Sequence, residues 1–133
     1  MALDPEAVLI AYLRDSEDVA LITEEVLGDT PTNISEPWVR VTMFDEASTH
    51  GRAVRHLLEV QFQIDCYAGK RGGQELASDL SAAIVDAIEA MPEATFEDAV
   101  VTATQSRRRR NDDSSFKPPM HCYAVTATVW IHP

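Results

Sequence analysis

The sequence is short of basic side chains. Its 133 residues include 22 Asp and Glu but only 11 Lys and Arg, so the formal net charge is −11 at pH 7. Proteins that bind duplex DNA independently of its sequence contact the phosphates with Lys and Arg side chains. The composition therefore argues against a general DNA-binding domain. An acidic protein can still stand beside DNA, where it would repel the phosphates.

Long apolar runs are also absent. No stretch approaches the ~20 apolar residues of a membrane-spanning helix, so we expect no membrane segment. The N-terminus lacks the basic and apolar regions of a signal peptide, because Asp4, Pro5 and Glu6 follow almost at once. The chain is 45% apolar and 25% charged, which is ordinary globular composition. By length we expect a single domain over residues 1–133 with one core.

Cysteine is scarce, and patterns typical of catalytic or metal sites are missing. Cys66 and Cys122 fall in strand-like runs, and we expect both to be reduced thiols. His121 lies beside Cys122, but neighbours on a strand point to opposite faces and cannot form a catalytic dyad. The histidines and cysteines show no C-x-x-C or H-x-x-x-H spacing. We therefore predict no catalytic residues, no metal and no cofactor.

The sequence does contain an alternating strand followed by an amphipathic helix. Successive side chains of a strand point to opposite faces, so alternation over residues 58–66 predicts a half-buried strand. After a glycine-containing turn, apolar residues recur three to four apart, which predicts a helix that ends at Pro92. The strand's apolar residues are Leu58, Val60, Phe62, Ile64 and Cys66, its polar residues are Glu59, Gln61, Gln63 and Asp65, and the helix stripe is Leu76, Leu80, Ile84, Ile88 and Met91.

The other segments complete an α+β pattern. Asp4 as N-cap and Pro5 at the first helical position predict a helix that ends near Arg14. A second short helical turn is expected near residues 19–22. Without βαβ alternation, the order α-β-β-α-β-β predicts a four-stranded, mainly antiparallel sheet covered on one face by helices. The remaining ranges are a loop at 28–37, a polar linker at 45–55, and strands at 38–44, 96–105 and 120–132.

Four consecutive arginines depart from the acidic composition. Arg107, Arg108, Arg109 and Arg110 fall in a polar stretch, residues 106–119, which predicts a hairpin loop. This loop could contact an acidic partner or subunit, remain a solvated turn, or touch nucleic acid. The stretch has no interleaved aromatic residues on which the bases of a single strand could stack, so the sequence does not favour single-stranded nucleic acid as the partner.

This order of elements resembles the tail terminator (tail completion) proteins of long-tailed bacteriophages. The likeness spans nearly the whole chain, although the arginine stretch does not map onto the family pattern. The residues that carry it are Asp4-Pro5-Glu6-Ala7-Val8, Pro37-Trp38-Val39-Arg40-Val41, the strand Leu58 to Tyr67, the helix with Leu76, Leu80 and Ile84, and the strand Tyr123 to Trp130.

The resemblance implies a structural protein of the virion tail, assembled in the host cytoplasm, and not an enzyme. Such proteins form a ring, usually hexameric, at the head-proximal end of the tail tube, where the ring stops tube growth and joins the head. The implied partners are other copies, the tail tube protein and a head–tail connector, and DNA would pass through without specific binding. Glu59, Gln61, Gln63 and Asp65 would face the channel. The alternatives are another head–tail connector or tube subunit, or a small enzyme or binding domain.

Overall fold

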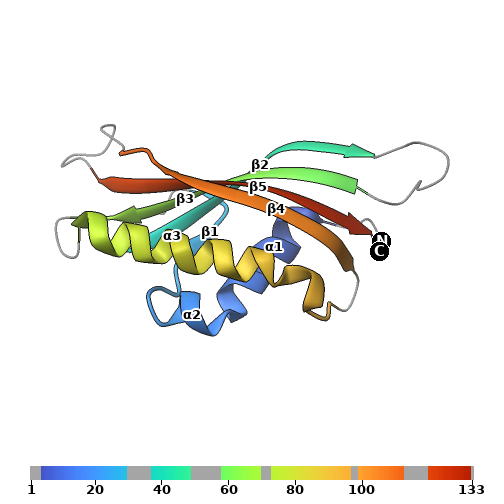
Figure 1. The fold of residues 1–133 in the computed structure, drawn as a ribbon, viewed down its shortest axis with the longest axis horizontal. Helices are drawn as coiled ribbons and strands as arrows, with labels where there is room; N and C mark the ends of the chain where they lie inside the picture. The colour runs from blue at the N-terminus through green and yellow to red at the C-terminus, as the bar shows by residue number, and fades with distance from the viewer. Residues whose placement is uncertain are drawn as a thin grey trace.

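The computed structural model describes residues 4–29, 37–48, 58–69, 73–96, 99–112 and 120–132, with the backbone alone for residues 45–48. The described strands form one sheet, and the helices lie together on one side of it (Figure 1). In chain order the elements are α1 (Pro5–Asp15), α2 (Glu17–Ala20), β1 (Val26–Leu27), β2 (Trp38–Ser48), β3 (Leu58–Ala68), α3 (Gly73–Glu89), the 3-10 helix η1 (Met91–Glu93), β4 (Val100–Arg110) and β5 (His121–His132).

The N-terminal helix begins as predicted. The Asp4 carboxylate accepts a hydrogen bond from the backbone N–H of Ala7 at 3.3 Å, and Pro5 occupies the first helical position. A cap of this kind contributes about 1 kcal/mol. Leu9 and Leu13 lie one turn apart and are both buried. The α1 helix therefore packs by one narrow apolar stripe.

The predicted amphipathic helix is confirmed as α3. Leu80, Ile84 and Ile88 are fully buried, which places the apolar stripe against the sheet. The helix begins at Gly73, whose φ of 51° lies in the left-handed region that favours glycine. Pro92 lies in η1 directly after the helix, as expected for a residue that cannot continue it.

The sheet has one strand more than predicted. Within the described residues its order is β1-β2-β3-β5-β4, with antiparallel pairs throughout except for β1, which pairs parallel to β2. The prediction of four strands was wrong because β1 contains only Val26 and Leu27. Two residues are too few for alternation to appear in the sequence.

Two strands are also longer or shifted relative to the prediction. β2 continues to Ser48 through residues expected to form a linker, and β4 runs from Val100 to Arg110 instead of ending at 105. Both extensions are paired along their length, β2 with β3 and β4 with β5. Backbone pairing satisfies the N–H and C=O groups of these polar segments. Side-chain polarity alone therefore misplaced the strand ends.

The main core lies between the sheet and the helices. Phe62 and Ile64 of β3 and Leu80 and Ile84 of α3 are almost fully buried in the same cluster, as the alternation predicted. Val39 and Val41 of β2 also belong to this core, so these two side chains point toward the helices. Cys66 belongs to the same cluster, and its burial raises the pKa of its thiol well above the ordinary value.

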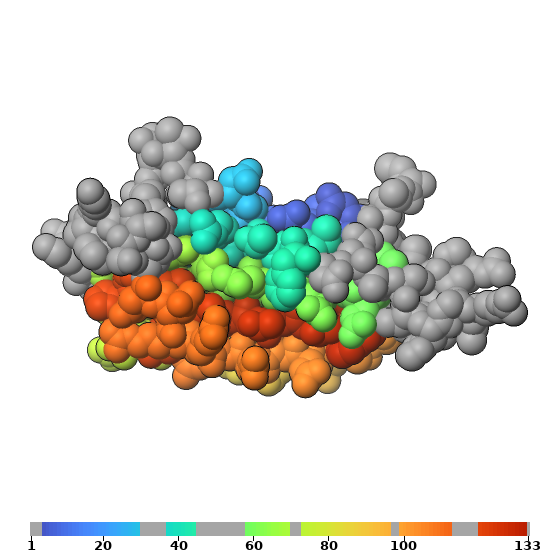
Figure 2. Space-filling model, turned by 90° about the horizontal axis from the view of Figure 1, so that it is seen from above, coloured from blue at the N-terminus to red at the C-terminus, as the bar shows by residue number. Residues whose placement is uncertain are grey.

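A second, smaller cluster lies on the opposite face of the sheet. There Trp38 and Tyr67 stack with ring centroids 4.4 Å apart and planes inclined by 13°, beside Met120 and Cys122. Cys66 and Cys122 are both buried and are not joined in a disulfide, in agreement with the prediction of thiols. Figure 2 looks down on this face, across which β2, β3, β5 and β4 run side by side.

Candidate functional site

The four arginines belong to a strand, not to a loop. β4 extends to Arg110 and pairs residue by residue with β5, from Arg107 opposite Thr126 to Arg110 opposite Tyr123. The predicted hairpin loop is therefore wrong over these residues. Because strand side chains alternate, the arginines divide into two pairs on opposite faces of the sheet.

Arg108 points to the helix side and is held there by α3. Its guanidinium donates hydrogen bonds to the Ser78 carbonyl at 3.0 Å, the Ser78 hydroxyl at 3.0 Å and the Ser81 hydroxyl at 2.9 Å. It also lies over the Tyr123 ring, 5.5 Å from the centroid. Arg108 therefore joins the end of β4 to α3 and is engaged within its own chain.

Arg110 is engaged by a carboxylate directly after the strand. It donates to Asp112 from Nε at 3.1 Å and from the terminal nitrogen at 2.8 Å. These bonds raise the pKa of Arg110 and lower the pKa of Asp112. The other carboxylate oxygen of Asp112 accepts the backbone N–H of Cys122 at 3.2 Å, and it lies 3.8 Å from His121 Nδ1. The exposed Asp112 thus ties the end of β4 to the start of β5.

Arg107 and Arg109 point to the other face. Both are exposed, and neither makes a hydrogen bond or ion pair with any described residue. They line a hollow together with Arg108 of the same edge strand and Thr126 of β5. Of the four predicted contact residues, these two have guanidinium groups that are bonded to no described residue, whereas those of Arg108 and Arg110 are bonded within the chain. We call Arg107 and Arg109 the arginine edge.

The predicted channel-facing residues share the face of the arginine edge. Glu59, Gln61 and Gln63 are partly exposed there, and Gln63 lies opposite Thr126, which in turn lies opposite Arg107. Asp65 differs, because it is only 2% exposed. Its carboxylate forms an ion pair within the same protomer, so it adds no exposed negative charge to a channel wall. The channel role of the other three stays a prediction.

Asp65 is paired with Arg40 across the neighbouring strand. The Arg40 guanidinium donates to the Asp65 carboxylate at 3.1 Å and to the Tyr67 hydroxyl at 2.8 Å, and Gln63 donates to the other Asp65 oxygen at 3.0 Å. Arg40 also lies 5.5 Å from the centroid of the Tyr67 ring. This network orients Tyr67 against Trp38. The arrangement is structural, since a buried carboxylate needs a partner.

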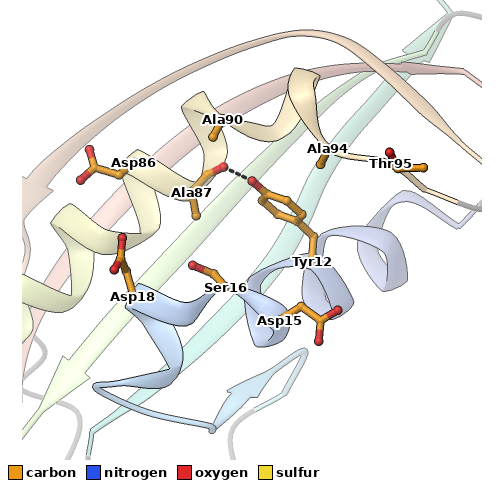
Figure 3. A pocket seen from close by; sticks show the side chains of 9 residues that line it. All are labelled: Tyr12, Asp15, Ser16, Asp18, Asp86, Ala87, Ala90, Ala94 and Thr95. Atoms are coloured by element: carbon orange, nitrogen blue, oxygen red, sulfur yellow. Dashed lines mark hydrogen bonds between the residues drawn. The ribbon is translucent and has the colours of Figure 1, made fainter.

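An acidic hollow of about 390 Å³ lies in the helix layer (Figure 3). Three carboxylates lie at its rim, those of Asp15 and Asp18 from the N-terminal helices and that of Asp86 from α3. Tyr12 crosses the gap and donates its hydroxyl hydrogen to the Ala87 carbonyl. Burial, and secondarily the charge of Glu93, raise the pKa of Tyr12. Tyr12 is therefore a neutral tether between the two helices beside a negative surface.

Metal-ligating side chains are dispersed over the described residues. Among them no group of three or more His, Cys, Asp and Glu residues comes together as a metal site. Of the helices that the structure describes, none is long and apolar enough to cross a membrane.

Sequence reasoning missed two features of these surfaces. The Arg40–Asp65 pair depends on the β2–β3 register, which places the two residues directly opposite each other. The acidic hollow brings α1 and α2 together with α3, which is distant from them in the sequence. The excess of Asp and Glu over residues 4–29 was a readable signal, but its position relative to the arginines required the sheet order.

Comparison with known proteins gives a family and a fold. The family model described as Tail completion protein gp17 matches residues 7–117. A chain of the solved structure described as "Virion of native gene transfer agent (GTA) particle" superposes with a TM-score of 0.69. The match covers 97% of this chain and 95% of that chain at 14% sequence identity, so it is a likeness of fold. No curated protein sequence gives a significant match.

Proposed function

This chain belongs to the tail completion protein gp17 family, a family of structural phage tail proteins, and we propose that it ends growth of the tail tube. In this proposal several copies form a ring, six by analogy with the family that the sequence resembles, at the head-proximal end of the tube. The ring blocks further addition of tube subunits and presents the surface that joins the filled head. The role is structural and needs no catalysis.

The observation that carries the proposal is the family match over residues 7–117. The fold likeness to a chain of a phage-like virion particle supports it. The sheet also suits the role, because one face is packed by helices and the other carries Gln61, Gln63, Thr126 and Thr128. The uncharged side chains of this face would not attract DNA phosphates, and its two exposed cations, Arg107 and Arg109, lie at the edge strand.

The test is removal of the gene from an infecting phage. We expect tail tubes of uncontrolled length and filled heads without tails, because nothing would end polymerisation or form the joining surface. Electron microscopy of negatively stained lysates measures both outcomes, and supplying the wild-type chain from a plasmid should restore normal tails.

The same experiment separates the alternatives. Loss of tubes altogether would indicate a tube subunit. Tubes of normal length that fail to attach to heads would indicate a connector with no part in termination. Normal, attached tails in the absence of the protein would refute the proposal.

A further inference from the structure

We propose that the arginine edge of one copy docks on the acidic N-terminal side of a second copy, in a head-to-tail contact that closes the ring. The inference rests on the proposed function, since it names the surfaces by which copies would meet. We define the acidic side by the carboxylates of the N-terminal segment, which are Asp4, Glu6, Asp15, Glu17, Asp18, Glu24, Glu25 and Asp29.

The acidic side is almost devoid of compensating charge. Its carboxylates are exposed except for the partly exposed Glu6, and none forms an ion pair with a described residue. Arg14 is the only base in this segment, and it donates to the Val26 carbonyl at 3.0 Å. Asp15 and Asp18 stand at the hollow where Asp86 adds a further charge. So many like charges repel one another in the free protomer, and a cationic partner would relieve that repulsion.

The sheet order places the two surfaces on opposite sides of the protomer. β4 is one edge strand and β1 is the other, with three strands between them. The α1 helix packs against β1 and β2, so the acidic side accompanies the far edge. Figure 2 shows β4 along one long side of the molecule and the N-terminal segment along the other.

This placement suits a closed ring. A head-to-tail contact joins two different patches, and the patches must lie on different sides of the protomer so that each copy binds two neighbours. Charges of opposite sign at the two edges meet this condition, whereas a two-fold dimer would bring like charges together. Arg107 and Arg109 extend from the edge strand itself, where a neighbour can reach them without crossing the sheet.

The division of the arginines sharpens the inference. Arg108 and Arg110 are bonded to Ser78, Ser81 and Asp112 of their own chain. Only Arg107 and Arg109 therefore serve the neighbour. Charges on an edge strand also discourage unwanted strand pairing, so protection against aggregation is the competing role for this pair.

The experiment measures the mass of the purified protein by sedimentation over rising concentration at low salt. We expect ring formation by the wild type and roughly tenfold or greater weakening in Arg107→Glu/Arg109→Glu. The matched pair is Arg107→Ser/Arg109→Ser and Arg108→Ser/Arg110→Ser, each of which removes two positive charges from the same strand. The first should weaken the rings, whereas the second should still form rings while melting at a lower temperature. Adding Asp15→Arg/Asp18→Arg to the Glu variant returns the net charge to that of the wild type and should restore rings.

Several outcomes would overturn the inference. Rings that form equally well with Arg107→Glu/Arg109→Glu would show that copies meet elsewhere, and the proposed function would still stand on the tail-length assay. A wild type that stays monomeric at millimolar concentration would also exclude this contact between copies, and the proposed function would again stand on the tail-length assay. Retardation of DNA by the wild type but not by Arg107→Ser/Arg109→Ser would assign the pair to nucleic acid. Aggregation of that variant in place of ring loss would assign it to edge protection.

Discussion

Removal of Arg40 should destabilise the fold by leaving a buried carboxylate without its cation. The Asp65 side chain is 4% exposed and that of Arg40 is 29% exposed, with 3.1 Å between their charged atoms. Breaking a buried pair by removing one partner costs about 3–5 kcal/mol. We expect Arg40→Met to cost about 3 kcal/mol, the lower end of that range, because Arg40 is partly hydrated.

Adding Asp65→Asn to Arg40→Met tests this explanation, because the second change should raise the stability that the first change lowers. Asp65→Asn in the Arg40→Met background removes the uncompensated charge and keeps a polar group beside Gln63. The double variant should therefore regain about 1–2 kcal/mol relative to Arg40→Met. If the stability losses of Arg40→Met and Asp65→Asn were independent, they would add, and the double variant would be the least stable of the three.

Urea denaturation at one fixed protein concentration measures these differences. With a slope near 2 kcal/mol/M, a loss of 3 kcal/mol lowers the midpoint by about 1.5 M. Arg107→Met is the matched control, because it makes the same chemical change on the same face at an exposed site, and it should shift stability by less than about 0.5 kcal/mol. A double variant less stable than Arg40→Met would refute the account of Asp65 as a charge that depends on Arg40.

Two further predictions follow from the strand faces and from Asp112. Phe62→Ala should cost roughly 3–5 kcal/mol of stability because it opens a cavity under α3. Gln63→Ala should cost about 1 kcal/mol because it loses the hydrogen bond to Asp65. Equal losses of stability in urea denaturation would mean that the two faces of the strand are misassigned. Because Arg110 lowers the pKa of Asp112, the stability advantage of the wild type over Asp112→Asn should be complete above pH ~4 and lost as the pH falls further. Denaturation curves at several pH values measure this, and an advantage that persists in acid would contradict the role of the Asp112 carboxylate.

Much of the fold was readable from local patterns. The alternation of β3 and the stripe of α3 predicted their facing sides, because the strand and helix periods directly assign side chains to one face. Asp4 and Pro5 likewise predicted the start of α1. The ends of β2 and β4 were not readable, because pairing with β3 and β5 overrides the polar composition of those segments.

The candidate site likewise has some features that the sequence determines and others that depend on the tertiary structure. By itself the sequence determined that the chain is acidic, that its arginines are consecutive, and that Glu59, Gln61 and Gln63 share a face with Asp65. Only the tertiary structure decided that Arg108 binds α3, that Asp65 is buried against Arg40, and that the arginine edge lies across the sheet from the acidic side. The physical reason is that charge and periodicity are local properties of the chain, whereas partners and opposite edges depend on which distant strands pair.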